Sequence, residues 1–394
     1  MRGDRIISEI SEGVYFIGAM HWERKLFDEL ISLPDGTSYN AYLIKDEKTA
    51  LIDTVDPSKK DVLFSALDEI GIDSIDYVVS HHTEQDHSGA IPDILDRYRD
   101  AKVIASKLGK DLLKRHLLIQ DERIIPVRDG EELSLGKRTL SFIYAPWVHW
   151  PETMLTYLKE EKILFTCDFF GSHLATSKIF ADENERIYDA AKRYYAEIMM
   201  PFRSKIKEHI RKIENLEIKM IAPSHGPIYR KPEFIINAYK DWISDNVKNE
   251  VIIAYVSMHG SIKRAVEIFA EHLDNKNIPY RIFDLPVSDI GEIAMSLVDA
   301  GALVVATPTV LTGMHPLALY ATYLVSIFKP KTRYISMIVS YGWGGRVLNQ
   351  AKELLANNLN AEFLEPVTIE GYPDDKDVQN LKKLVDELAE KMSS

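Results

Sequence analysis

The stretch at residues 80–89, Ser-His-His-Thr-Glu-Gln-Asp-His-Ser-Gly, directly follows a strand-like apolar run at residues 75–79. It places four possible metal ligands within six residues, namely His82, Glu84, Asp86 and His87. Side chains of this kind add little to a hydrophobic core, and their spacing suits a tight loop in which they converge on one point. Imidazole together with carboxylate suits iron, manganese or zinc, whereas calcium sites use oxygen ligands only. The stretch therefore predicts part of a transition-metal site, although a solvated polar loop would also carry such residues.

Three further candidate ligands follow strand-like runs later in the chain. They are His149 after residues 140–148, Asp168 after residues 163–167, and His225 after residues 218–224. Sites in α/β proteins form at the carboxyl ends of strands, although each residue alone could also be a satisfied buried histidine or a turn aspartate. Six to seven ligands exceed the needs of one ion, whereas two ions that share a bridging carboxylate would use them all. We therefore predict a two-metal site.

The ligand pattern resembles that of the flavodiiron proteins, a branch of the metallo-β-lactamase fold. The shared features are the His-x-Glu-x-Asp-His cluster that begins at His82, followed along the chain by His149, Asp168 and His225. In the hydrolytic relatives of this fold the position of Glu84 is typically a histidine. A third carboxylate offsets more of the charge of two cations and favours ions that must become ferric. Glu84 therefore favours iron and redox chemistry over zinc and hydrolysis.

The resemblance also implies a role for individual residues. It assigns His82, Glu84 and His149 to one iron, assigns Asp86, His87 and His225 to the other, and makes Asp168 the bridge. Related proteins place a further histidine near the metals on an N-terminal loop, so His21 is a candidate for that position, and Tyr195 is a second candidate. We expect His81 to point away from the ligands, and His116 and His173 to be surface or core residues.

Composition bounds the class of protein. The chain has 394 residues, of which 46% are apolar and 27% charged, which is enough for two globular domains. A net charge of −12 opposes nucleic-acid binding, and the basic clusters at residues 203–212 and 329–333 are typical of solvated faces. No apolar run approaches the length of a membrane span and no signal peptide is evident, so we expect a cytoplasmic protein without membrane attachment. The single cysteine, Cys167, excludes an intrachain disulfide and a four-cysteine iron centre within this sequence.

The first domain is predicted to cover residues 1–248. Alternating apolar and polar residues up to about residue 57 indicate antiparallel strands, and helix and strand patterns then alternate up to residue 129. Strands return from residue 133 to 166, and a long helix with a kink at Pro201 is predicted for residues 185–216. This order suits an αββα sandwich, which is the fold that the resemblance implies.

The second domain is predicted to cover residues 249–394. Five strand candidates begin near residues 251, 280, 302, 333 and 361, and they alternate with five helical stretches. This alternation is typical of a doubly wound, flavodoxin-like domain, whose ligand site lies at the carboxyl ends of the strands.

Three loops at those strand ends predict a binding site for FMN. Hydroxyl groups and a helix N-terminus in the first loop suit a phosphate, although Ile262 replaces the threonine that usually ends such a loop. Glycines in the later loops let the backbone approach a flat ring, on which Trp343 or Tyr341 can stack. The candidate residues are Ser257, Met258, His259, Gly260, Ser261 and Ile262, then Thr307, Pro308, Thr309, Leu311, Thr312 and Gly313, and finally Ser340, Tyr341, Gly342, Trp343, Gly344 and Gly345.

The resemblance now covers nearly the whole chain and implies a function. FMN would pass electrons from a carrier, such as rubredoxin, to a diiron centre that reduces dioxygen to water or nitric oxide to nitrous oxide. Family members of this kind form head-to-tail homodimers or dimers of dimers. The alternative is a zinc hydrolase of the glyoxalase II kind, whose second domain is only a flavodoxin-like binding module.

Overall fold

The computed structural model describes residues 3–355 and 359–393, which form two compact units. The first unit comprises Met1–Tyr195 and Phe202–Ile243, and the second comprises Ala196–Pro201 and Ser244–Ser394. The division after Ile243 lies before the predicted boundary after residue 248. Lys248, which was predicted to end the first domain, begins the first strand of the second unit. Among the described residues, no helix has the length and apolarity needed to cross a membrane.

The first unit contains a sheet of seven strands in the order β1-β2-β5-β6-β7-β8-β9. Neighbouring strands are antiparallel from β1 to β6 and parallel from β6 to β9. The strands are β1 (Arg5–Ser11), β2 (Val14–His21), β5 (Thr37–Lys45), β6 (Thr49–Ile52), β7 (Tyr77–Val79), β8 (Lys102–Ser106) and β9 (Ile124–Val127). A small hairpin of β3 (Leu26–Phe27) and β4 (Ile31–Ser32) follows β2.

A second sheet of five strands in chain order faces the first. It is antiparallel except for the parallel pair that β13 and β14 form. Its strands are β10 (Glu132–Ser134), β11 (Thr139–Tyr144), β12 (Met154–Leu158), β13 (Ile163–Cys167) and β14 (Met220–Pro223). Apolar side chains of both sheets meet in one core, for example Phe16 and Tyr42 from the first sheet with Phe142 and Phe165 from the second.

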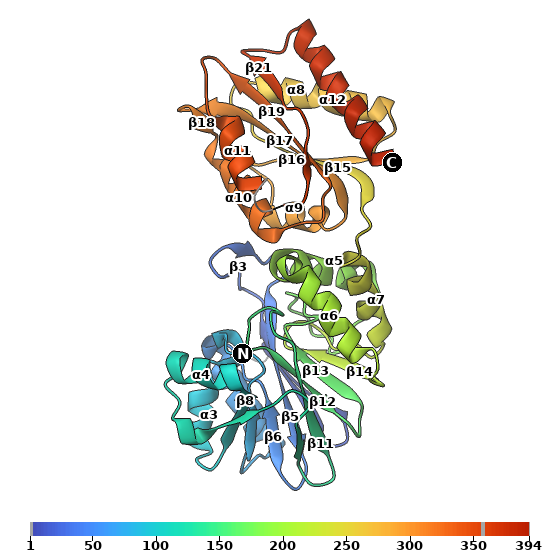
Figure 1. Cartoon of the computed structure of the whole chain (residues 1–394). Coiled ribbons are helices and arrows are strands. Elements are labelled where there is room, and N and C mark those ends of the chain that lie inside the picture. Colours follow the sequence, from blue (N-terminus) through green and yellow to red (C-terminus); the bar gives the residue numbers. More distant parts are fainter. Residues whose placement is uncertain (1–2, 356–358, 394) are drawn as a thin grey trace. The chain divides into compact units, whose positions relative to one another are not determined.

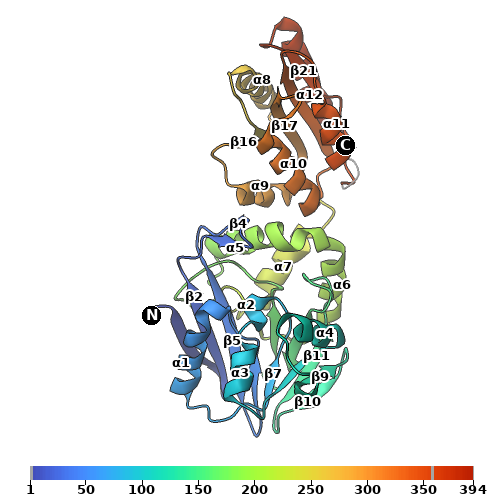
Figure 2. The same ribbon diagram turned by 90° about the vertical axis from the view of Figure 1, so that its left-hand side faces the viewer.

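Helices cover the outer faces of the two sheets (Figures 1 and 2). The outer face of the first sheet packs against α1 (Lys60–Ile70), α3 (Ile91–Arg97) and α4 (Lys107–His116). Beside the second sheet lie α5 (Glu185–Tyr194), α6 (Arg203–Ile213) and α7 (Pro232–Trp242). Short helical turns are α2 (Gln85–Ser88), η1 (Pro57–Lys59) and η2 (Asp121–Arg123). This arrangement confirms the predicted αββα sandwich.

The long helix predicted for residues 185–216 is two helices in the structure. After α5 the chain forms a wide π-helical turn, η3 (Tyr195–Met199), and a tight 3₁₀ turn, η4 (Met200–Phe202), before α6 begins. Pro201 lies in this interruption, and it cannot donate the backbone hydrogen bond that a continuous helix needs. The break is therefore larger than the predicted kink.

The second unit has a parallel sheet in the order β16-β15-β17-β19, with β20 and β21 both pairing with β19. Numbered along the chain, the strands have the order 2-1-3-4-5 of flavodoxin-like folds, which confirms the predicted doubly wound domain. The strands are β15 (Lys248–Tyr255), β16 (Tyr280–Asp284), β17 (Ala300–Val310), β19 (Tyr334–Tyr341), β20 (Glu362–Phe363) and β21 (Val367–Glu370). The short β18 (Gly313–Met314) pairs with the end of β17.

Helices also cover both faces of this sheet. Along β15, Val251 and Ile253 face α8 (Ser261–Asn275) and α12 (Asp375–Ser393). Ile252 and Ala254 face the opposite side, where α9 (Ile290–Leu297), α10 (Pro316–Phe328) and α11 (Val347–Leu355) pack. Both faces of the central strands are buried, which explains their nearly continuous apolar sequence.

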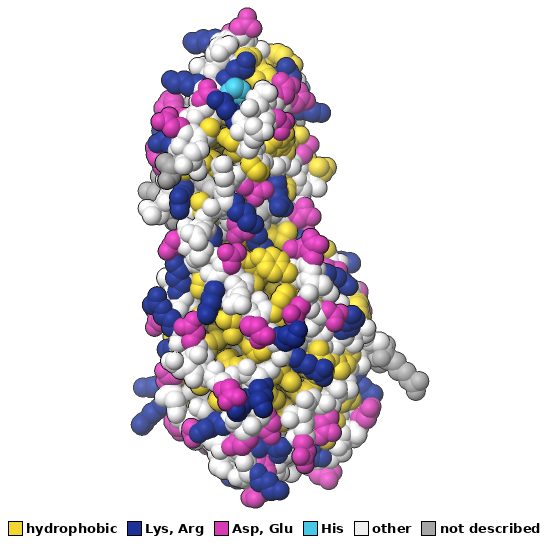
Figure 3. Space-filling view, turned by 90° about the vertical axis from the view of Figure 1, so that its right-hand side faces the viewer, with side chains coloured by type: hydrophobic (Ala, Val, Ile, Leu, Met, Phe, Trp, Pro, Cys, Tyr) yellow, Lys and Arg dark blue, Asp and Glu magenta, His cyan; other side chains and the backbone are white. Residues whose placement is uncertain are grey.

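The basic cluster at residues 203–212 does not form a uniform cationic surface. Lys205 pairs with Glu208 at 3.1 Å, and Lys212 lies 3.4 Å from a carboxylate oxygen of Asp129. On the face drawn in Figure 3, Lys and Arg side chains alternate with Asp and Glu.

Candidate dinuclear metal centre and flavin pocket

The loop after β7 brings four ligand candidates together. The short helix α2 carries Asp86 and His87, and Glu84 directly precedes it. The carbonyl of Glu84 accepts hydrogen bonds from the backbone N–H of His87 at 3.1 Å and from the hydroxyl of Ser88 at 2.9 Å. These bonds fix the tight loop that the sequence spacing predicts.

The first group of side chains comprises His82, Glu84 and His149. Nε2 of His82 and Nε2 of His149 each lie 3.1 Å from the same oxygen, Oε2 of Glu84. His82 is fully buried, whereas His149 and Glu84 retain slight exposure. One face of this group therefore remains accessible.

The second group comprises Asp86, His87 and His225. Oδ2 of Asp86 lies 3.2 Å from Nε2 of His225, and Oδ1 of Asp86 lies 3.3 Å from Nε2 of His87. All three side chains are buried.

Asp168, at the end of β13, lies between the two groups. Its Oδ1 is 3.1 Å from Nε2 of His87 and 3.2 Å from Nε2 of His225. Its Oδ2 is 3.6 Å from Nε2 of His149 and 3.7 Å from Nε2 of His82. Each carboxylate oxygen thus faces one group, which is the geometry of a carboxylate that bridges two cations.

The donor atoms fit a pair of metal ions. Adjacent ligands on an octahedral ion with bonds of about 2.1 Å are about 3 Å apart, close to the distances within each group. Both carboxylate oxygens of Asp86 and Nε2 of His225 are buried and have no hydrogen-bond partner among the described residues, which is rare in native proteins. A cation in each group would satisfy these atoms.

Hydrogen bonds from outside the two groups orient the candidate ligands. Glu152 accepts from Nδ1 of His82 at 2.8 Å, Nδ1 of His225 donates to the carbonyl of Ser38 at 2.6 Å, and the hydroxyl of Tyr194 donates to Oδ1 of Asp168 at 2.8 Å. Sequence reasoning missed all three contacts. Glu152 lies three residues after His149, and that proximity was the only local signal.

The prediction for Tyr195 needs correction, because its neighbour Tyr194 takes the place beside the metal ligands. Successive residues on a helix point about 100° apart, so only one of the two tyrosines can face Asp168. The ring of Tyr195 instead contacts Tyr239 and Trp242, with centroid separations of 5.4 and 5.3 Å.

His21 does not contact a candidate ligand itself but is linked to His225 through Tyr39. Its Nδ1 is 3.4 Å from the hydroxyl of Tyr39, and the ring of Tyr39 contacts that of His225 at 5.9 Å. Burial and the nearby Lys59 and Arg24 lower the pKa of His21.

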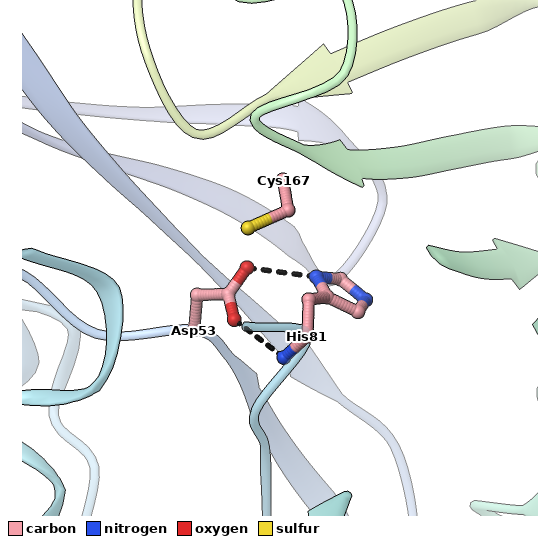
Figure 4. Close-up of side chains that lie close together, drawn as sticks. All are labelled: Asp53, His81 and Cys167. Carbon is pink, nitrogen blue, oxygen red and sulfur yellow. Dashed lines mark hydrogen bonds and ion pairs between the residues drawn. The ribbon is translucent and has the colours of Figure 1, made fainter. Parts of the chain in front are cut away.

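His81 belongs to a separate buried cluster with Asp53 and Cys167 (Figure 4). Nδ1 and the backbone N–H of His81 lie 2.7 and 2.9 Å from the two carboxylate oxygens of Asp53, and its Nε2 lies 2.7 Å from the hydroxyl of Thr156. Since both ring nitrogens have partners, His81 is not available as a ligand, and it points away from the two groups as expected. The hydroxyl of Ser224 also donates to Asp53, so this carboxylate joins the loops of His82 and His225.

His173 lies closer to the site than the sequence indicated. Its ring contacts those of His225 and Tyr194 at 5.2 and 4.8 Å, and its Nδ1 is 3.0 Å from the hydroxyl of Thr37. Burial holds the pKa of His173 well below its usual value.

The carboxylates govern the protonation of the ligand histidines. Burial alone would lower the pKa of each imidazole, but neighbouring carboxylates outweigh it and raise the pKa to about 10 for His82, about 9 for His87 and about 10 for His225. For Asp168, burial would raise the pKa, but the surrounding histidines hold it well below its usual value. Without a metal ion, the carboxylates of the site therefore hold protons on these histidines, and a metal ion would have to displace them.

We expect the metal-free protein to release protons when it binds metal at pH 7. His82, His87 and His225 are protonated there because their pKa values lie above 7, and each must become neutral to bind an ion. Apparent affinity should consequently rise with pH up to about 10, the pKa of His82 and His225. Calorimetric titration with Mn²⁺ in buffers of different ionisation enthalpy measures the protons released. Release of no proton would contradict this prediction.

The second unit contains a cavity of about 340 Å³ at the carboxyl ends of its strands. Ten of the predicted flavin-binding residues line it, namely Ser257, Met258, His259, Ser261, Ile262, Pro308, Thr309, Ser340, Tyr341 and Gly342. Gly371 and Tyr372, which follow β21, also line it and were not predicted. Gly260 caps the N-terminus of α8 with a φ of 87°, a left-handed conformation that favours glycine.

The remaining predicted residues of these loops lie elsewhere. Gly344 and Gly345 line a neighbouring cavity of about 420 Å³, which shares Thr309 and Tyr341 with the first. The Oγ1 of buried Thr307 accepts a hydrogen bond from the N–H of His315. Leu311, Thr312, Gly313 and Trp343 line neither cavity, and the side chain of Trp343 is 70% exposed. Tyr341 and Trp343 were both predicted to stack on the flavin ring. Only Tyr341 lines the first cavity.

An αββα unit with a shared-carboxylate pair of metal positions, joined to a flavodoxin-like unit, defines a dinuclear metalloprotein with a nucleotide-type pocket. A family model described as ODP family beta lactamase matches residues 37–226. The chain is 37% identical to a nitric oxide reductase of Moorella thermoacetica over 98% of both chains.

Two solved structures have the same fold throughout. Rubredoxin oxygen:oxidoreductase from Desulfovibrio gigas matches with a TM-score of 0.95 and 29% identity, covering 98% of this chain and 99% of that one. The flavodiiron protein of Giardia intestinalis matches with a TM-score of 0.92 and 26% identity, covering 98% and 97%. The chain belongs to the flavodiiron family.

Proposed function

We propose that this protein reduces dioxygen, nitric oxide or both, using electrons that pass through FMN to a diiron centre. The observation that carries the proposal is the pair of ligand groups that share Asp168. Support comes from relatives that match over nearly their whole length and are named as reductases of these two gases.

The candidate ligands are assigned to two iron positions. His82, Glu84 and His149 would hold one iron, Asp86, His87 and His225 the other, and Asp168 would bridge them. A pair of iron ions held there would supply Lewis acidity and electron transfer to a small gas molecule. The side chains position and tune these ions, and the hydrogen bond from Tyr194 keeps the bridging carboxylate oriented.

Access to the metal positions is provided by a cavity of about 290 Å³ in the first unit. Glu84 and Asp86 lie in its wall together with Tyr39, His116 and Trp150. A diatomic gas needs far less space, so the cavity does not exclude either candidate substrate.

FMN would occupy the cavity of the second unit. We propose that its phosphate binds at the loop of Ser257 and at the N-terminus of α8, and that its flat ring lies against Tyr341 and Gly342. The electron donor is proposed to be rubredoxin or a similar small carrier, since a relative that matches over 97% of this chain is named rubredoxin-oxygen oxidoreductase. A head-to-tail homodimer and a cytoplasmic location stay predictions.

The hydrolase alternative is set aside. The matched relatives are oxidoreductases over both units, and Glu84 contacts both His82 and His149 at the position where hydrolytic relatives typically have histidine. A zinc hydrolase would not need the cavity of the second unit.

Metal analysis and gas consumption test the proposal directly. We expect about two irons and one FMN per chain, and consumption of dioxygen or nitric oxide that depends on added reduced rubredoxin. Rates with each gas under matched reductant would rank the two substrates. A colourless zinc protein that consumes neither gas would refute the proposed function. Full activity with NADH alone would refute the proposal that a separate carrier protein donates the electrons.

A further inference from the structure

We propose that Glu152 is a positioning residue that makes the two metal positions unequal, so that the ion held by His82 binds more tightly and is oxidised at a lower potential. The inference rests on the two-metal site proposed above. It concerns a residue outside both ligand groups, in the loop between His149 and β12.

One oxygen of Glu152 makes all its side-chain hydrogen bonds. Oε1 accepts from Nδ1 of His82 at 2.8 Å, from the backbone N–H of Thr83 at 3.0 Å and from the hydroxyl of Thr83 at 2.6 Å. Oε2 is buried, and within the part of the chain that the structure describes it has no hydrogen-bond partner. The carboxylate is thus fixed against the back of the His82 ring, opposite the nitrogen that faces Glu84.

The main chain around Glu152 is equally well held. Its carbonyl accepts from the hydroxyl of Ser106 at 2.7 Å, and the same hydroxyl oxygen caps α4 by accepting from the N–H of Gly109. Because the side chain is only 1% exposed, solvent does not screen its charge from His82.

The second metal position is supported differently. Nδ1 of His225 donates to a backbone carbonyl, that of Ser38, at 2.6 Å. A carbonyl fixes the orientation of an imidazole as a carboxylate does, but it brings no net charge. The shared Asp168 serves both positions. The first has Glu84 and Glu152 in addition, both of which contact His82. The second has Asp86 and also the buried Asp53, which accepts hydrogen bonds from His81 and Ser224 rather than from a candidate ligand.

This asymmetry has a chemical consequence. A carboxylate that accepts from Nδ1–H makes Nε2 a stronger donor to a bound ion, and the added negative charge favours the more highly charged ferric state. The ion at the first position should therefore be the more tightly bound and the first to become ferric.

The substitution Glu152→Gln separates charge from shape. The amide oxygen can replace Oε1 and keep all three hydrogen bonds, while the amide nitrogen takes the place of the oxygen that has no partner. Glu161→Gln is a matched control, since Glu161 also has one bonded oxygen, 2.6 Å from Nε of Arg138, and one buried oxygen without a hydrogen-bond partner. Glu161 precedes β13, whereas Asp168 follows that strand, so the control lies at the opposite end of the sheet.

Anaerobic titration with Fe²⁺ against a coloured chelator measures affinity at each position. In an Asp86→Asn background, which weakens the second position, Glu152→Gln should reduce the affinity of the remaining site by about ten- to a hundredfold. In a Glu84→Gln background, which weakens the first position, the same change should have little effect. Glu161→Gln should change neither affinity.

A redox titration followed by electron paramagnetic resonance provides a second readout. Glu152→Gln should raise the potential at which the mixed-valent diiron signal appears, which loss of folding alone would not do. Equal effects of Glu152→Gln in both backgrounds, or an unchanged potential, would overturn the inference. Such results would leave the proposed function intact, whereas wild-type protein that binds no iron would refute the function itself.

Discussion

Replacement of Asp168 by asparagine is expected to abolish stable binding of both irons and to lower gas reduction about a thousandfold. Oδ1 of Asp168 contacts His87 and His225, and Oδ2 faces His149 and His82. Asparagine puts an uncharged amide nitrogen at one of these positions, which repels the cation there and leaves four histidines around one fewer carboxylate. Loss of about 4 kcal/mol of charge stabilisation corresponds to about a thousandfold in rate.

Iron content per chain and gas consumption measure this effect. Tyr194→Phe is the matched control, because it removes only the hydrogen bond from the phenol to Oδ1 of Asp168. We expect the control to keep both irons and to lose about tenfold or less in rate. If Asp168→Asn protein retained two irons and the wild-type rate, Asp168 would not be a bridging ligand.

Replacement of Gly260 by glutamate is expected to remove FMN while the iron content stays unchanged. Gly260 lies at the N-terminus of α8 with a φ of 87°, so a side chain there is strained, and its carboxylate would compete with the flavin phosphate. A carboxylate within about 4 Å of a phosphate opposes binding by about 4 kcal/mol, or about a thousandfold in affinity. Flavin absorbance and iron analysis of the same sample measure both quantities.

Gly260→Ala is the control for the backbone strain. A Cβ at this position meets no atom within 4 Å, so alanine has the strained conformation without the charge and without a clash. We expect the alanine variant to keep FMN at moderately reduced affinity. A folded glutamate variant with full flavin content would place the phosphate elsewhere.

Much of this protein was determined by the local sequence. Strand-like runs place Asp168 and His225 just after β13 and β14, whereas the run predicted before His149 is a strand only up to Tyr144. The spacing of His82, Glu84, Asp86 and His87 predicted the tight loop that these residues form. Strand and helix alternation in the second unit likewise predicted a doubly wound sheet. These features are readable because each depends on residues close together in the chain, such as a strand and the loop that follows it.

The tertiary structure decided how distant residues meet. Each oxygen of Asp168 faces histidines that are distant in the chain. Tyr194 rather than Tyr195 reaches Asp168 because of the orientation in which α5 packs beside the second sheet. The support of His82 by Glu152 joins residues seventy positions apart. No local periodicity marks such a pair, because a buried glutamate and an exposed one look alike in sequence, and only the packing of the two sheets takes the water away from this carboxylate.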